Sequence, residues 1–177
     1  MRPPSPEHGE DEAAWLPRAR AASERGPFGL HTHWTSPEHA RPTGGRPAAT
    51  VRAQVEWLRG RGVNPRFFCG GGWYTDDDVR ATVTELGLVD CTATTFPLRY
   101  AAEARVVDGP SAALLPATHS LGMLFRSRSL PDYVHVYFHD TDLRDRRRAL
   151  ALEVALHALA RLRPVADLDE LSVALGR

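Results

Sequence analysis

Two histidines separated by one residue carry the strongest chemical signal in this chain. His31 and His33 lie in the segment Gly-Leu-His-Thr-His-Trp-Thr, at the end of a stretch with strand character. On an extended backbone, residues i and i+2 point to the same side, with Cα atoms roughly 6.5–7 Å apart. Neutral imidazole is a preferred zinc ligand, and two rings placed in this way can converge on one ion. The pair predicts a divalent-metal site, with zinc as the expected metal.

A catalytic zinc ion needs three protein ligands and an open position for water. His39, on the loop that follows the pair, and Asp140 are the candidates for the third ligand. The structural alternative is that one histidine caps the strand end through a hydrogen bond while the other is exposed.

A second histidine-rich strand end, Val-His-Val-Tyr-Phe-His-Asp, spans residues 134–140. Here His139 stands where a general acid could protonate a leaving group or stabilise an oxyanion. Its neighbour Asp140 is a candidate substrate contact, although it could instead belong to the cap of the next helix. His135 is interpreted as an interior histidine whose hydrogen bonds are satisfied.

The segment Cys69-Gly70-Gly71-Gly72-Trp73 forms a third strand end. A glycine-rich turn can hold an anion at a helix N-terminus, but the acidic run 76–78 would repel phosphate here. We interpret Gly71 and Gly72 as a tight turn that brings Trp73 to the rim, where all three contact substrate and the indole stacks on a sugar ring. A core tryptophan in a turn is the alternative. The strand–serine–helix elbow of serine hydrolases is absent.

Strands and helices alternate along the chain from residue 27. Strands are expected at 28–31, 66–69, 88–93 and 133–138, with weaker β segments at 104–107 and 112–115. Helices are expected at 48–61, from an N-cap at Thr75 to Leu86, at 145–162 with Asp142 as its cap, and after Asp167. This order is typical of a parallel sheet, in which ligands bind at the carboxyl ends of the strands. All three strand-end motifs fall at such ends.

Composition restricts the class of protein. The chain has 177 residues, 42% hydrophobic and 25% charged, with a formal net charge of zero. This balance argues against a broad nucleic-acid or anionic-membrane surface. No lysine is present, which excludes Schiff-base chemistry, and no apolar run is long enough for a transmembrane helix. Two cysteines without metal-site spacing indicate free thiols in a cytoplasmic protein.

Residues 1–26 are expected to form a tail with one weak helix near 13–24, which Pro17 interrupts or starts. The α/β domain is then expected to span 27–177.

The three strand-end motifs resemble those of the polysaccharide deacetylases, the NodB-homology family of metal-dependent deacetylases. Gly29–Thr32 is similar to the family's second motif, whose histidine binds metal, and Phe67–Tyr74 to the third motif, a wall of the groove. Ala113–Pro116 resembles the family's Leu-Pro segment. Tyr137–Asp140 resembles the last motif, whose histidine acts as the acid.

The resemblance implies a distorted (β/α) barrel and hydrolysis of an N-acetyl or related amide group of a glycan or small molecule. Three departures stand beside it. Thr35 occupies the position of the family's second metal histidine, so His33 or His39 would substitute, and Phe68 stands where the family usually carries arginine. The aspartate pair of the first motif has no counterpart in residues 1–26. A full barrel takes roughly 250 residues, so we expect a partial barrel without its first strand, truncated or degenerate, that could self-associate through an open sheet edge.

Two other functions compete with this one. Phosphoesterases and amidohydrolases also open with a His-x-His strand, but they need further ligands at later strand ends. A non-catalytic glycan-binding module would use Trp34, Trp73 and Tyr74 as stacking surfaces.

Overall fold

The computed structural model describes residues 1–99, 101 and 103–176. Its centre is a parallel sheet of β1 (Gly29–Thr32), β2 (Phe67–Gly70) and β3 (Val89–Asp90), with β2 in the middle. The register places His31 beside Cys69 and Phe68 beside Asp90. The predicted strands are confirmed here, although β3 is shorter than expected. The carboxyl ends of the first two strands therefore lie next to each other.

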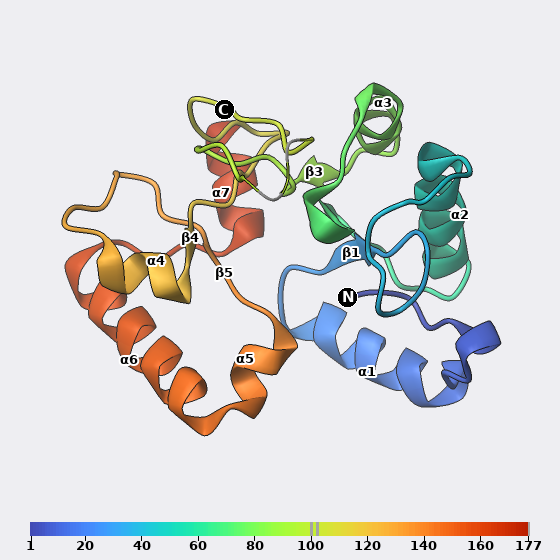
Figure 1. Cartoon of the computed structure of the whole chain (residues 1–177), viewed down its shortest axis with the longest axis horizontal. Helices are drawn as coiled ribbons and strands as arrows, with labels where there is room; N and C mark the ends of the chain where they lie inside the picture. The colour runs from blue at the N-terminus through green and yellow to red at the C-terminus, as the bar shows by residue number, and fades with distance from the viewer. Residues whose placement is uncertain (100, 102, 177) are drawn as a thin grey trace.

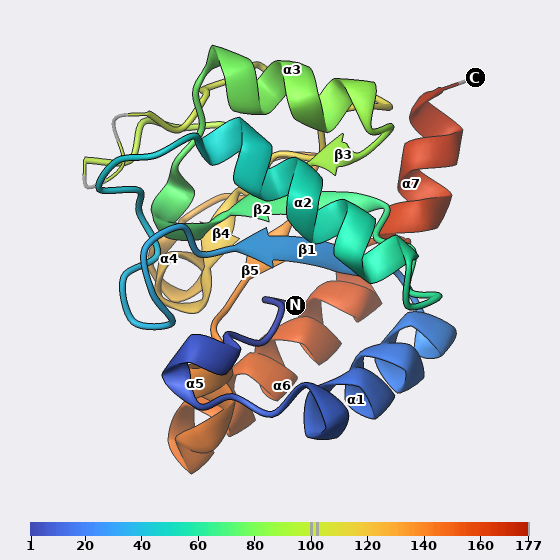
Figure 2. The same cartoon turned by 90° about the vertical axis from the view of Figure 1, so that its right-hand side faces the viewer.

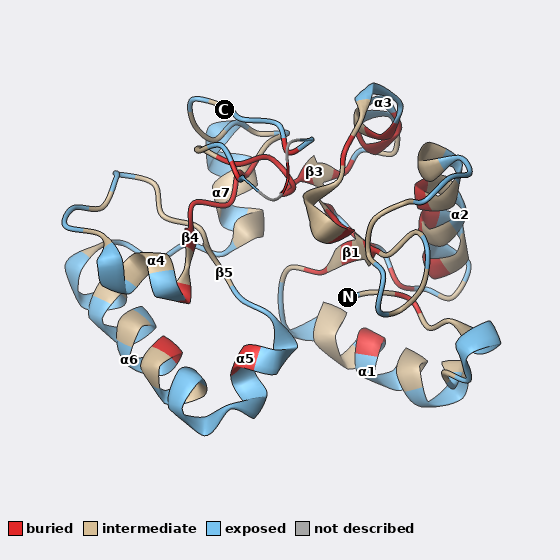
Figure 3. Ribbon diagram, in the orientation of Figure 1, coloured by how far each residue is buried: buried red, intermediate tan, exposed pale blue. Residues whose placement is uncertain are grey.

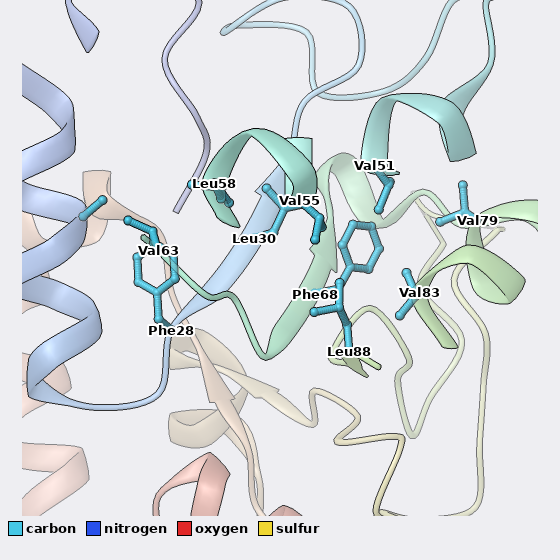
Figure 4. Close-up of a cluster of buried hydrophobic side chains, with 11 residues drawn as sticks. Phe28, Leu30, Val51, Val55, Leu58, Val63, Phe68, Val79, Val83 and Leu88 are labelled. Atoms are coloured by element: carbon cyan, nitrogen blue, oxygen red, sulfur yellow. The ribbon is translucent and has the colours of Figure 1, made fainter. Parts of the chain in front are cut away.

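Helices α2 (Pro47–Arg59) and α3 (Asp77–Glu85) connect these strands and cover one face of the sheet (Figures 1 and 2). Apolar residues at helical spacing on α2 point into the same core as Leu30 and Phe68 (Figure 4). Each such side chain contributes about 1.5–3 kcal/mol when it leaves water. The buried core on this face contains Phe28, Leu30, Val51, Val55, Leu58, Val63, Phe68, Val79, Val83 and Leu88.

Residues 1–26, expected from the sequence to form a tail with one weak helix, pack against this core through that helix. A short 3-10 turn η1 (Pro6–His8) precedes α1 (Glu12–Arg25), which contains Pro17 and buries Ala19 completely. The Trp15 ring lies 5.7 Å from that of Trp57 in an edge-on contact. The predicted helix is confirmed, and the apolar contacts of its inner side explain why it is docked.

The opposite face of the sheet carries a smaller apolar cluster of Phe67, Cys91 and Leu115. Leu168 and Leu171 of α7 (Leu168–Leu175) pack against it. Asp167 caps α7 by accepting the Glu170 N–H at 2.8 Å, as the sequence predicted. Phe67 is the first residue of β2, so this helix packs at the amino-terminal end of the strands, away from the ends that carry the histidines.

A second parallel pair, β4 (His119–Ser120) and β5 (Val136–Tyr137), lies beyond β3. Single bridges continue the pairing between the two sheets, from Asp90 to Leu114 and from Thr94 to Ala117. Within the described part of the chain, β1 and β5 do not pair with each other, so these strands form no closed barrel. One backbone bond from His31 N–H to the Met1 carbonyl, 3.0 Å long, lies along the free edge of β1.

Three helices surround the second sheet on the side away from α2 and α3 (Figure 1). They are α4 (Leu121–Arg126), which the sequence did not predict, α5 (Asp140–Arg144) and α6 (Arg146–Leu162). Along α6, Leu152 is buried while much of the remaining surface is exposed (Figure 3). No helix in the residues described is both long and apolar enough to cross a membrane.

Two predicted helix caps are wrong by one and three residues. Asp76, not Thr75, caps α3, and its carboxylate accepts the Val79 N–H at 2.7 Å. Asp145, not Asp142, caps α6, because a separate short helix, α5, separates β5 from it. In both places several polar residues precede the helix, and tertiary packing selects one of them.

Candidate functional site

His31 and His33 lie together at the carboxyl end of β1, as their spacing predicted. Their ring centroids are 5.0 Å apart and their planes meet at 70°. Both side chains are half-buried. The strand that carries them is held by Leu30 in the core and by the buried Thr32, whose hydroxyl bonds the Gln54 side chain of α2 at 2.8 Å. The buried residues on either side of His31 therefore fix the backbone that carries the histidine pair.

Burial lowers the pKa of His31 from 6.5 to about 4. The positive charges that His33, the Met1 amine and His139 can carry lower it further, while a hydrogen bond with the Cys69 backbone acts in the opposite direction. At neutral pH the ring is therefore uncharged, and a neutral ring has a lone pair to offer. This is the state that a metal ligand requires.

The His33 ring is held by a hydrogen bond at one of its two nitrogens. Its Nδ1 lies 2.8 Å from the carbonyl oxygen of Pro37, on the loop after β1. In metal sites, a ligating histidine commonly donates its second N–H to such a carbonyl, which fixes the tautomer and the orientation of the ring. His33 has this feature, so its chemistry fits that of a metal ligand.

The glycine turn after β2 packs directly against this pair. A Cβ atom on Gly71 would come within 2.4 Å of the Thr32 oxygen and 2.9 Å of His33 Cδ2. Gly72 has a left-handed φ of 60°, and its carbonyl accepts a 3.1 Å bond from Arg41 Nε. Gly71 therefore lets the turn approach the histidine strand closely, whereas Gly72 takes the left-handed conformation and leaves room for the Arg41 side chain.

Trp73 bridges the first and second sheets. It takes a positive φ of 61°, which is unusual for a residue other than glycine. Its ring lies 4.9 Å from that of Tyr137 at an angle of 77°. The half-buried indole also packs against the small cluster of Leu98, Ala101 and Ala104. Trp73 therefore connects the carboxyl ends of β2 and β5.

His139 follows β5 and is exposed. It contributes to the lowered pKa of His31, so the ends of β1 and β5 lie within electrostatic reach of each other. Its backbone N–H donates to the carboxylate of Asp142 at 2.9 Å, which sets the start of α5. Asp140 is exposed and pairs with Arg144 at 2.8 Å. In contrast, His135 is a satisfied interior histidine, as expected, with Nδ1 at 3.1 Å from the Leu115 carbonyl oxygen.

The histidine pair supplies ligands of the type that zinc prefers, but fewer than the three that a catalytic zinc site needs. Among residues 1–99, 101 and 103–176, no three His, Cys, Asp or Glu side chains converge as a metal group. His39, one candidate for the third ligand, is exposed and bonds Ser36 at 3.2 Å within its own loop. Asp140, the other candidate, forms an ion pair with Arg144. Two protein ligands are therefore what the described chain offers, and other ligands would have to be solvent or substrate.

Sequence reasoning missed a pocket of about 430 Å³ beside His139. It lies between the ends of β4 and β5 and the helices α4, α5 and α6. Ser120, Arg126, Thr141 and Arg148 contribute polar groups to its walls. Their positions are far apart in the chain and belong to no motif, so only the packing of the helices brings them together.

The described residues define an α/β protein with small parallel sheets and a histidine pair at the carboxyl edge of the first. Comparisons with protein-family models, with curated proteins and with solved structures gave no match. The assignment of a function therefore depends on the residues of this chain alone.

Proposed function

We propose that this protein is a metal-dependent hydrolase that acts on an N-acetyl or related amide group. The observation that carries the proposal is the histidine pair itself. His31 is neutral at physiological pH, and the Nδ1 of His33 is bonded to a carbonyl at 2.8 Å. Two such rings 5.0 Å apart at the carboxyl edge of a parallel sheet would supply two ligands to one divalent ion, with solvent or substrate supplying the others.

A bound zinc ion would polarise the amide carbonyl and activate a water molecule for attack. The chain's own residues would do the rest. His31 and His33 would hold the ion through their ring nitrogens. Once the water oxygen has bonded to the carbonyl carbon and released a proton to solvent, the exposed His139 would give a proton to the leaving amine as the C–N bond breaks. Trp73 and Tyr137 form an aromatic wall between the two strand ends. The resemblance to polysaccharide deacetylases agrees with this division of roles.

The protein is proposed to be cytoplasmic. Cys69 and Cys91 are free thiols, and burial raises the pKa of Cys69 to about 12 and that of Cys91 above its usual range. Unreactive reduced thiols fit a reducing compartment.

Zinc titration of metal-free protein at pH 7.5, followed by calorimetry, tests the metal site. We expect one equivalent to bind wild type, and stoichiometric binding to be lost in His31→Ala and His33→Ala. His157→Ala is the matched control, because His157 is exposed on α6 and bonds only its own helix at Glu153. Absence of binding by wild type, or equal loss in all three variants, would overturn the metal site.

Release of acetate from N-acetylglucosamine oligomers and from 4-nitroacetanilide tests the reaction. His139→Gln is expected to lower kcat by about 10²–10⁴-fold while zinc still binds, as for loss of a general acid. Hydrolysis of a generic phosphoester without amide hydrolysis would favour the phosphoesterase alternative. Oligomer binding that a chelator does not change, with no hydrolysis, would favour a glycan-binding module that uses Trp34, Trp73 and Tyr74 as stacking surfaces.

A further inference from the structure

The pocket beside His139 has an unusual charge balance. The carboxylate in its wall belongs to Asp142, whose side chain is only 8% exposed. Both of its oxygens interact with other groups of the protein. One oxygen accepts the His139 backbone N–H at 2.9 Å, and the other pairs with Arg148 at 2.5 Å. Asp142 is thereby neutralised within the wall, and it does not offer a free negative charge to the pocket.

Arg126 supplies a positive charge that the described chain leaves unpaired. It ends α4 and is exposed, and within the residues described its side chain forms neither an ion pair nor a hydrogen bond. Its guanidinium folds back over Gly122, with the two terminal nitrogens 3.5 and 3.6 Å from where a Cβ atom would stand. These are ordinary van der Waals distances, so the guanidinium lies beside Gly122, and both residues line the pocket.

The other polar groups of the wall can donate hydrogen bonds. The Arg148 side chain is 58% exposed, and one contact with Asp142 leaves several of its five N–H groups available. The Thr141 and Ser120 hydroxyls and the His139 ring also line the pocket. A guanidinium fork with nearby hydroxyl donors matches the geometry of a carboxylate or phosphate group.

We propose that this pocket binds an oxyanion, a carboxylate or phosphate group, carried by the substrate. Arg126 and Arg148 bind the anion, and His139 lines the same pocket while it lies within electrostatic reach of His31. The role as a substrate subsite rests on the proposed function, whereas anion binding itself does not. The preferred substrate is then an acylated amine that also bears an acidic group, and neutral N-acetyl compounds, which lack the anion, are expected to be hydrolysed more slowly.

Binding to chelator-treated protein at pH 7.5 tests the pocket without the metal. The probes are inorganic phosphate, N-acetylglycine and the neutral N-acetylglycinamide, measured by calorimetry and by the NMR shifts of the His139 ring. We expect at least one anion to bind and N-acetylglycinamide not to bind. Saturation by N-acetylglycine identifies a carboxylate as the group, and saturation by phosphate alone identifies a phosphoryl group.

Arg126→Gln should weaken binding of that anion about tenfold or more, the usual loss for a hydrogen bond to a charged group. Arg128→Gln is the matched control, since Arg128 is exposed two residues further on and lies outside the pocket wall. Thermal unfolding of both variants checks that they are folded. Failure of both anions to bind, or an equal loss in the two variants, would overturn the oxyanion site. Zinc binding by the same preparations shows separately whether the metal proposal stands.

Discussion

The Nδ1 atom of His33 lies 2.8 Å from the carbonyl oxygen of Pro37, and a carbonyl can only accept a hydrogen bond. The ring must therefore carry a proton on Nδ1, which leaves Nε2 as the site of the lone pair in the neutral form. We predict that long-range ¹H–¹⁵N NMR of metal-free protein at pH 7.5 shows the Nδ1–H tautomer for this residue. Zinc should then shift the Nε2 resonance and leave Nδ1 protonated.

His39 is the internal comparison for that experiment, because it is exposed on the same loop. We expect its two ring nitrogens to respond weakly to zinc. A His33 ring with its proton on Nε2 would contradict the prediction and remove the orientation that favours metal binding.

Gly71 is predicted to be intolerant of any side chain. A Cβ atom there would meet backbone at 2.4 Å and His33 Cδ2 at 2.9 Å, distances that require the strand ends to separate. We expect Gly71→Ala to lower the free energy of unfolding by about 1–3 kcal/mol, as for overpacking of a filled site. Because His33 is one of the displaced neighbours, zinc affinity should fall as well.

Gly109→Ala provides the control, since a Cβ atom at that position has nothing within 4 Å. Chemical denaturation should show this variant within about 0.5 kcal/mol of wild type. Equal stability of the two variants would mean that the turn after β2 does not press on the histidine strand.

Stability should depend on pH through His31. Its pKa is 6.5 unfolded and about 4 folded, chiefly because burial disfavours the charged ring. Between these values the unfolded chain binds more protons than the folded one, so the free energy of unfolding falls as pH decreases from 6.5 to about 4. Above pH 6.5 both states are neutral at this residue and its contribution is constant. The expected effect is on the order of 1–3 kcal/mol.

Urea denaturation of metal-free wild type and His31→Gln across that range measures this effect. Burial also lowers the pKa of His119 and His135, so the quantity of interest is the difference between the two profiles. The profile of His31→Gln should be shallower, whereas His157→Gln should follow wild type. Parallel profiles for His31→Gln and wild type would show that the ring titrates normally in the fold.

The sequence predicts most of the first sheet because its elements carry local signals. Val51, Val55 and Leu58 repeat at helical spacing, and the segment Phe67–Gly70 is a compact apolar run followed by a turn. The last strand was predicted over six residues, but only Val136 and Tyr137 pair. Its partner β4 has just two residues before α4 begins, so the length of pairing is set by another part of the chain.

In the candidate site, too, local sequence places some residues and tertiary packing places the others. His31 and His33 are neighbours in sequence, and extended geometry alone places them together. By contrast, Arg126 and Arg148 belong to two helices, one of which, α4, is short and lacks an apolar period. Their meeting beside His139 depends on how α4 and α6 pack, which no local pattern encodes.

Asp142 is predicted to be the residue that fixes both His139 and Arg148. It is buried and accepts from the His139 backbone at 2.9 Å while it pairs with Arg148 at 2.5 Å. Asp142→Ala leaves two donors without their partner and should cost about 1–3 kcal/mol in the free energy of unfolding. Asp142→Asn keeps an acceptor for the His139 N–H, so its loss should be smaller.

Asp140→Ala separates this effect from the loss of any aspartate in α5. Asp140 and Arg144 form an exposed pair, with side chains 72% and 78% accessible, and such pairs contribute about 0–1 kcal/mol. Chemical denaturation should therefore rank the variants as Asp142→Ala, Asp142→Asn and Asp140→Ala, from the largest loss to the smallest. If Asp140→Ala were as destabilising as Asp142→Ala, the start of α5 would depend on helix charge in general. The position of His139 would then not rest on its bond to Asp142.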